Sequence, residues 1–103
     1  MTSLTSKQRA HLRKLAHHLK PIVLVGNDGV TAAVLASIMD ALNTRELLKV
    51  KLQESAPIDV RAAAEQIRAE LHDVHSVRTI GRTMVFYRPH PENPEIRLPK
   101  PAS

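Results

Sequence analysis

The sequence predicts an α/β fold: a single-layer, four-stranded mixed sheet with three helices, in the order αβαβαββ. Apolar residues recur at helical spacing in three segments of the chain. Four other segments alternate between apolar and polar residues or are rich in β-branched and aromatic residues, as strands are. Alternating helices and strands favour parallel pairing through right-handed crossovers, and 103 residues are enough for one such domain.

The first helix is predicted over about residues 6 to 19. Thr5 and Gln8 have the spacing of a capping box at its start, and Pro21 ends it. Residues 22 to 25 are all apolar and β-prone, which is typical of an inner strand that is covered on both faces. The apolar stripe of the helix consists of Leu12, Leu15, Ala16 and Leu19.

Two more helices are predicted to begin at capping side chains. Thr31 can cap one helix, which continues to about residue 42, and Asp59 can cap the other, which continues to about residue 71. Between them, residues 47 to 52 alternate in polarity, which indicates a half-exposed strand. Lys49 and Lys51 make the outer face of this strand positive.

The last two strands are predicted to form a hairpin. They cover residues 74 to 80 and 83 to 88, and Gly81 and Arg82 form the two-residue turn between them. The remaining tail holds five of the seven prolines, so we expect it to be extended and without regular structure. The chain is therefore divided into a domain of residues 1 to 88 and a Pro-rich tail of residues 89 to 103.

Positive charge is concentrated near the N-terminus. The formal net charge is +5, and the first acidic residue is Asp28. Charge of one sign on one segment attracts polyanions, although a charged helix face can also be a merely solvated one. On the predicted helix, Arg9 and Arg13 flank the apolar stripe. The cations that precede Asp28 are Lys7, Arg9, Arg13, Lys14 and Lys20.

A Gly-x-x-Gly loop over residues 26 to 29 joins the first predicted strand to the second helix. Glycines let the backbone approach a ligand, and the N–H groups at the start of the helix can hold a phosphate oxygen. A turn that needs glycine only for positive φ explains the pattern equally well, and the carboxylate of Asp28 disfavours phosphate. The loop lacks the endings of a P-loop or a dinucleotide fingerprint, so no nucleotide cofactor is expected.

Other classes of chemistry find no support in the sequence. There is no cysteine, the six histidines lack metal-ligand spacing, and the serines and acids form no catalytic constellation. We therefore expect a non-catalytic protein without metal, cofactor or small-molecule substrate. No segment resembles a signal peptide or a membrane span, which predicts a cytoplasmic protein without a membrane partner. The only aromatic residues, Phe86 and Tyr87, favour contact with a nucleic-acid backbone over extensive base stacking.

Four segments, taken together, resemble a known family: LRKLAHHLKPIVLVGNDGV, RELLKVKL, IGRTMVFYRP and IRLPK. In this order and spacing they are similar to the CRM domain (chloroplast RNA splicing and ribosome maturation), in its stand-alone bacterial YhbY-like form. The resemblance implies a fold similar to the C-terminal domain of the third translation initiation factor. It also implies an RNA-binding ribosome assembly factor, whose partner is ribosomal RNA in precursors of the large subunit.

The resemblance also points to a binding surface. The family's Gly-x-x-Gly loop, likened to that of KH domains, matches residues 26 to 29, and its basic first helix matches the segment around Arg13. Asp28 departs from the basic or neutral residue common in that loop, so backbone amides and Asn27 would make the contact. The candidate RNA-binding residues are Lys7, Arg9, Arg13, Lys14, Lys20, Gly26, Asn27, Asp28, Gly29, Lys49, Lys51, Arg82 and Arg88.

Two other functions fit the same residues. A DNA-binding chromosomal protein of similar architecture would also need a basic helix. A protein-docking adaptor could instead use the Pro-rich tail, including the PENP segment of residues 91 to 94, as an extended ligand.

Overall fold

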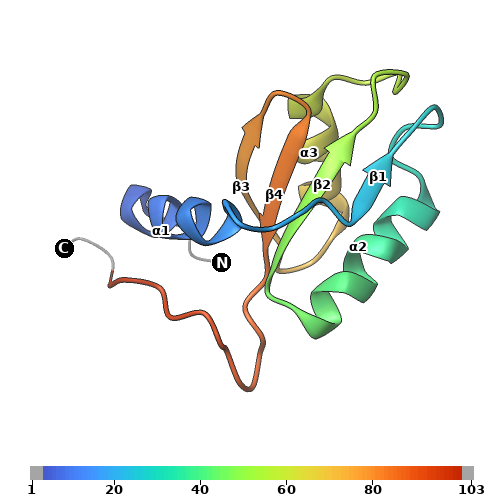
Figure 1. Ribbon diagram of the computed structural model, residues 1–103. Helices are drawn as coiled ribbons and strands as arrows, with labels where there is room; N and C mark the ends of the chain where they lie inside the picture. Colours follow the sequence, from blue (N-terminus) through green and yellow to red (C-terminus); the bar gives the residue numbers. More distant parts are fainter. Residues whose placement is uncertain (1–3, 101–103) are drawn as a thin grey trace.

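The computed structural model describes residues 4 to 100, in which three helices pack on one four-stranded sheet (Figure 1). This arrangement confirms the predicted α/β class and the order αβαβαββ. Along the chain, the elements are α1 (Ser6–Ala16), β1 (Val23–Val25), α2 (Ala32–Thr44), β2 (Leu47–Leu52), α3 (Val60–Glu70), β3 (His75–Ile80) and β4 (Thr83–Tyr87).

The helices begin where their capping residues predict. In α1 the Thr5 hydroxyl accepts the Gln8 backbone N–H at 3.1 Å, and the Gln8 side chain accepts the Thr5 N–H at 3.0 Å. Thr31 and Asp59 accept N–H groups in the first turns of α2 and α3, at 3.1 and 2.8 Å. These bonds favour the observed starts, because the first N–H groups of a helix have no partner within it.

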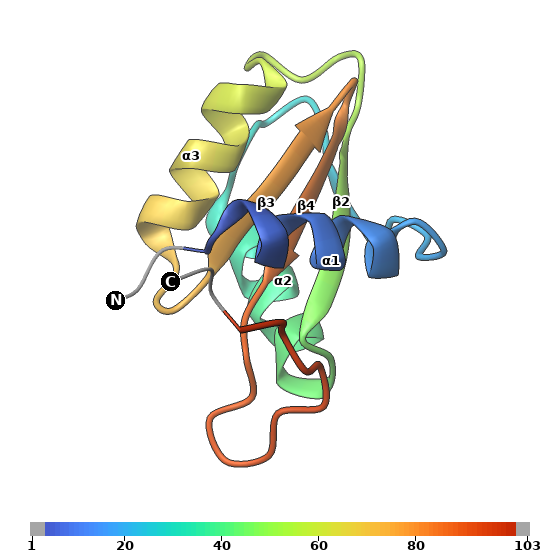
Figure 2. The same ribbon diagram turned by 90° about the vertical axis from the view of Figure 1, so that its left-hand side faces the viewer.

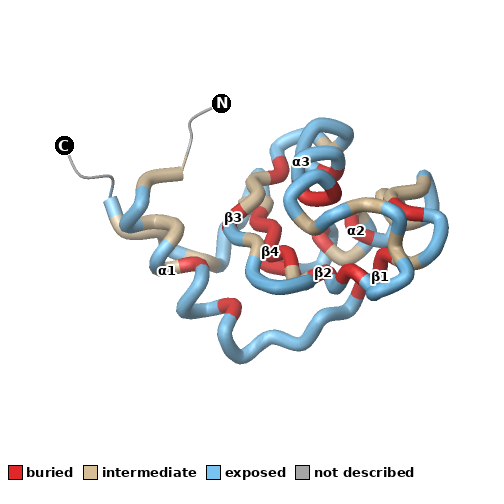
Figure 3. Tube along the Cα trace, turned by 90° about the horizontal axis from the view of Figure 1, so that it is seen from above, coloured by how far each residue is buried: buried red, intermediate tan, exposed pale blue. Residues whose placement is uncertain are grey.

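The first helix is shorter than predicted. It ends at Ala16, and the chain then turns, with the Leu19 N–H donating to the Ala16 carbonyl at 2.9 Å. Pro21 disfavours a helical conformation in the residue before it. Residues 17 to 22, called the linker below, instead cross the outer face of the sheet to reach β1 (Figure 1). The linker is exposed along its whole length (Figure 3).

The strands follow the order β1-β2-β4-β3. β1 and β2 are parallel and are joined by α2, whereas β4 is antiparallel to both β2 and β3. Ile80 pairs with Thr83 around a turn in which Gly81 has a φ of +57°. The predicted hairpin is therefore confirmed, together with its two-residue turn.

The prediction of an inner strand over residues 22 to 25 is wrong. β1 lies at the edge of the sheet, where Val23 and Val25 are buried and Leu24 is 53% exposed. Its buried face packs on α2, whereas no helix of residues 4 to 100 covers the other face at β1, because α1 lies over the other three strands (Figure 2). The apolar residues of β1 thus form one buried face and one face that is exposed to solvent.

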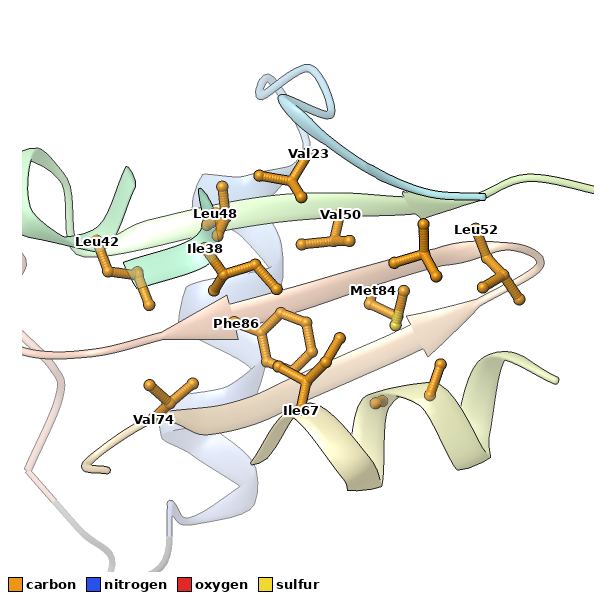
Figure 4. Close-up of a cluster of buried hydrophobic side chains, with 13 residues drawn as sticks. Val23, Ile38, Leu42, Leu48, Val50, Leu52, Ile67, Val74, Met84 and Phe86 are labelled. Carbon is orange, nitrogen blue, oxygen red and sulfur yellow. The ribbon is translucent and has the colours of Figure 1, made fainter. Parts of the chain in front are cut away.

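The main core lies between the sheet and the two helices α2 and α3 (Figure 4). Phe86 is fully buried at its centre, between Ile38 of α2 and Ile67 of α3. Burying one large apolar side chain contributes about 1.5 to 3 kcal/mol to folding. The sheet side of this core consists of Val23, Val25, Leu48, Val50, Leu52, Met84 and Phe86.

A second, smaller core lies on the opposite face, under α1 (Figure 2). α1 contributes only two buried residues to it, Leu12 and Ala16. Leu15, predicted in the same stripe, is 38% exposed, because this single helix touches the sheet along a narrow line, and Leu19, also 38% exposed, lies in the linker beyond the end of the helix. The sheet side of the second core consists of Leu47, Val77, Val85 and Tyr87, and Leu4, Ile96 and Leu98 pack around it.

The Pro-rich tail folds back along this second core. Within residues 89 to 100 it forms no helix or strand, as predicted. The buried carboxylate of Glu46 accepts the backbone N–H groups of His90, Glu95 and Ile96, each at 2.7 Å. Further along, the Gln8 side chain donates to the Pro99 carbonyl at 3.2 Å. The tail therefore joins the start of β2 to α1.

Glu46→Gln is expected to lower the free energy of unfolding by about 1 to 3 kcal/mol at neutral pH. Burial alone would raise the pKa of Glu46, but the three N–H donors and nearby His90 hold this pKa below its ordinary value of 4.5. The stabilisation is therefore fully present above that value and is lost as the pH falls through the lower, folded pKa.

The check is the midpoint of thermal unfolding for both proteins between about pH 7 and about pH 3. The difference between wild type and Glu46→Gln should shrink as the pH falls. Glu92→Gln, which changes an exposed carboxylate of the same tail, is the control and should differ little from wild type at any pH. A difference that stays constant with pH would contradict the role of ionised Glu46.

Candidate nucleic-acid interface

The outer face of the sheet is half covered. α1 lies over the amino-terminal ends of β2 and β3 and the carboxyl-terminal end of β4 (Figure 2). Beyond α1, Lys51 of β2, Arg78 of β3 and Leu24 of β1 are exposed. The strand pairing places Arg78 opposite Val85 and Leu24 beside Lys51, so these side chains share the α1 side of the sheet. We call this part of the sheet the open face.

The open face and α1 have one sign of charge. Neither α1 nor any of the four strands contains an acidic residue. The positive charge that the sequence places near the N-terminus therefore continues in space over Lys49, Lys51 and Arg78. A surface with cations of one sign raises the local concentration of a polyanion.

A hollow of about 170 Å³ lies where α1 meets the open face. We call it the α1–sheet hollow. Within residues 4 to 100, no carboxylate lies within 4.0 Å of a cationic group of Arg13, Lys49 or Arg78, all of which line it. Its polar lining is Arg13, His17, Lys49, Arg78 and Thr83, and its apolar lining is Ala16, Ile80 and Val85.

A second hollow, of about 280 Å³, involves the linker and the start of β2. We call it the linker hollow. Lys20 and Arg45 line it, and Lys49 lines both hollows. The structure thus brings together Arg13, Lys20 and Lys49 from the predicted set, although they come from a helix, the linker and a strand.

Two cations of these hollows, Arg45 and Arg78, were not predicted. The alternation of Arg78 with Ile80 in a hairpin strand could have placed Arg78 on the face of Val85. The register shift between Ser76 and Arg78 obscures this pattern, because it changes the facing of the residues before it. Arg45 follows a helix end, and no pattern in the sequence indicates its position.

Arg9 differs from the other cations of α1. It is half-buried, and its guanidinium donates to the carbonyl oxygens of Ser76 and Val77 at 2.6 and 3.0 Å, beside the irregularity in β3. Burial and the charge of Arg9 lower the pKa of His75, which stacks on Tyr87 with ring centroids 6.0 Å apart. Arg9 therefore fixes α1 on the sheet, whereas Lys7, Arg13 and Lys14 are exposed.

Arg9→Ala is expected to reduce the free energy of unfolding by about 1 to 3 kcal/mol, because two carbonyl groups lose a charged donor. Lys14→Ala, on the exposed side of the same helix, should change it by less than about 0.5 kcal/mol. Urea unfolding of the two variants and wild type tests this difference. Equal stabilities of the two variants would show that the Arg9 contacts do not hold α1.

Arg82 and Arg88 lie apart from the two hollows. Arg82 is exposed in the β3–β4 turn, where its Nη1 is 3.8 Å from Oε2 of Glu54. Arg88 is half-buried just after β4, and its backbone N–H donates to the Glu46 carbonyl at 2.9 Å. The structure therefore does not gather these two predicted residues with Arg13 and Lys49.

The Gly-x-x-Gly loop follows the carboxyl end of β1, at the same end of the sheet as the β3–β4 turn (Figure 1). Its tip is formed by Asn27 and Asp28, which are both exposed. The Gly29 N–H donates to the Gly26 carbonyl at 3.0 Å, and Gly29 has a φ of +72°. The loop leads into α2, whose first turn contains no acidic residue. It borders the open face on the side of β1, away from α1.

Gly26 and Gly29 differ in how strongly the structure requires glycine at each position. Gly29 needs its positive φ, which costs other residues about 1 to 2 kcal/mol. Gly26 has no such φ, but a Cβ there would lie 2.7 Å from Oε1 of Gln53. That atom is the end of an exposed, flexible side chain, which can move away.

We therefore expect Gly29→Ala to lower the free energy of unfolding by about 1 to 2 kcal/mol, and Gly26→Ala to lower it by less. Urea unfolding measures both values. Because Gly26→Ala keeps the fold, it also isolates the effect of a methyl group on any ligand at the loop. A larger loss of stability in Gly26→Ala than in Gly29→Ala would contradict this assignment.

Residues 4 to 100 contain no group of three or more histidine, aspartate and glutamate side chains placed to hold a metal ion. None of the helices described in this range is both long and apolar enough to cross a bilayer.

Comparison with known proteins gives a consistent result. Residues 4 to 88 match the family model of the CRS1 / YhbY (CRM) domain. An "RNA-binding protein" of Haemophilus influenzae is 41% identical over an alignment of 104 positions, which covers 97% of this chain and 99% of the relative. The "Probable RNA-binding protein YqeI" of Bacillus subtilis is 41% identical over 100 residues, or 93% of this chain and 99% of the relative.

A solved structure shares the fold. The solution structure of the hypothetical protein SAV1595 from Staphylococcus aureus, to which RNA binding is ascribed provisionally, matches with a TM-score of 0.77 at 38% sequence identity. The match covers 93% of this chain and 99% of that chain.

Proposed function

The chain belongs to the CRS1/YhbY (CRM) domain family, which confirms the resemblance seen in its sequence, and on this premise we propose that it binds structured RNA without catalysis. Its relatives are named as RNA-binding proteins. The observation that carries the proposal is the absence of acidic residues from α1 and the strands, together with the cations that line both hollows.

The proposed contact is made to the sugar-phosphate backbone. Arg13 and Lys14 on α1 and Lys49 and Lys51 on β2 come from elements that pack on each other, so the positions from which these side chains extend are fixed relative to one another. Such contacts position a nucleic acid and provide affinity without reading its sequence. The Gly-x-x-Gly loop would contribute a second contact at the far side of the open face, through its backbone and Asn27.

We further propose that the RNA is ribosomal, in precursors of the large subunit, and that the protein acts in the cytoplasm as an assembly factor. This part of the proposal is supported by the family resemblance alone. Residues 1 to 88 would then be the RNA-binding domain, and the tail of residues 89 to 103 would serve it by holding α1. The contacts of Glu46 and Gln8 with the tail support that role.

Binding to purified large-subunit ribosomal RNA should weaken steeply with salt. Each phosphate contact that releases a counterion lowers log affinity by about 0.7 to 0.9 per tenfold increase in salt. Arg13→Glu/Lys14→Glu should therefore bind at least about 10-fold more weakly at moderate salt. The slope of its log affinity against log salt should correspond to about one or two fewer phosphate contacts. Filter binding or fluorescence anisotropy over a salt series gives both values.

Arg61→Glu, compared with the single variant Arg13→Glu, is the matched control, because each reverses one exposed cation and Arg61 lies on α3, beneath the other face of the sheet. Its binding and salt slope should stay close to those of wild type. Duplex DNA of equal length is the competitor that separates RNA binding from the DNA-binding alternative. Salt-independent binding, equal affinity for duplex DNA, or equal losses in the α1 and α3 variants would each overturn the proposal.

A further inference from the structure

The α1–sheet hollow has two kinds of lining that a phosphate alone would not use. Part of its lining is apolar: Ala16 and Val85 are buried, and Ile80 is 53% exposed. The three cations Arg13, Lys49 and Arg78 also line it. A bare phosphate gains from the cations but gains nothing from covering Ile80. A ligand that fits both parts is amphipathic, with an apolar surface next to negative charge.

Based on this lining, and resting on the proposed RNA binding, we propose that the α1–sheet hollow holds one unpaired nucleobase of the bound RNA. The base covers Ile80, and the phosphates on either side of it contact Arg13, Lys49 and Arg78. The protein would therefore prefer RNA with a single-stranded loop or bulge over a continuous duplex, in which the bases are stacked away from such a hollow.

The hollow is smaller than the pockets that hold larger organic ligands. Its volume, about 170 Å³, is below the roughly 300 Å³ at which pockets for larger organic ligands begin. It lies between a helix and a sheet that pack on each other through the second core, so it exists without the ligand.

The residues around the hollow can also recognise a base. Unstacked bases pack on the planes of histidine and arginine side chains as well as on aromatic rings. Here the exposed His17 and Arg78 supply such planes, and the Thr83 hydroxyl can donate or accept a hydrogen bond. Phe86 and Tyr87 are 0% and 3% exposed, so neither aromatic ring is available as a stacking platform.

The test compares two RNA strands of equal charge. One is a single-stranded RNA of about ten nucleotides, and the other is the same strand with abasic sites at its central positions. Stacking of one base is worth about 1 to 3 kcal/mol, so wild type should bind the abasic strand about 5- to 150-fold more weakly. Because the number of phosphates is unchanged, both strands should show the same salt slope.

Two matched variants locate the effect. Ile80 and Leu24 are each 53% exposed on the outer side of the sheet, but only Ile80 lines the hollow. Ile80→Ser should lose most of the preference for the base-bearing strand without a change in salt slope, whereas Leu24→Ser should keep it. Thermal unfolding of both variants controls for stability.

The outcomes distinguish this inference from the proposed function. If wild type binds both strands equally but with a steep salt slope, or if Ile80→Ser and Leu24→Ser behave alike, the base site is disproved and backbone binding stands. If wild type binds neither the strands nor ribosomal RNA, the proposed function itself fails. A loss confined to the base-bearing strand in Ile80→Ser supports the base site.

Discussion

The packing of α1 across half of the sheet is the interaction on which the rest of the structure depends. Two buried side chains, Leu12 and Ala16, hold the helix on the outer face. The main core, between the inner face of the sheet and the helices α2 and α3, contains no residue of α1 and so does not fix where α1 lies. The position of α1 therefore decides which part of the outer face is covered, which part stays open, and where the cations of the helix stand relative to Lys49 and Arg78.

Such a short helix cannot hold this position by its own helical stability. Isolated helices shorter than about 12 to 15 residues are marginal in water, so α1 depends on tertiary contacts. Arg9 ties it to β3, and the tail, held by Glu46, packs against the same small core and reaches Gln8. Arg9 and the buried carboxylate of Glu46 thus hold α1 and the tail in place. The other cations of α1 face outward.

Local patterns in the sequence predicted the elements well, and the surface only in part. The capping residues Thr5, Thr31 and Asp59 act on N–H groups three residues away, so they mark helix starts without knowledge of the fold. Whether a side chain contacts another helix or strand, by contrast, depends on the tertiary fold and not on its neighbours in the sequence. The sequence predicts that Leu24 lies in a strand covered on both faces, places Arg9 among the RNA-binding candidates on the flank of the apolar stripe, and gives no indication of Arg78. In each case the outcome depends on where α1 crosses the sheet, which no short-range spacing specifies.

The open face joins two properties that folding alone does not favour. Leaving Ile80 half exposed forgoes burial that a longer or differently placed helix would provide. Placing Arg13, Lys49 and Arg78 around one hollow, with no acidic residue on α1 or the strands, adds repulsion between like charges. A bound polyanion removes that repulsion, and one of its bases can cover Ile80. RNA relieves both costs at once, whereas a simple anion or an uncharged apolar partner relieves only one.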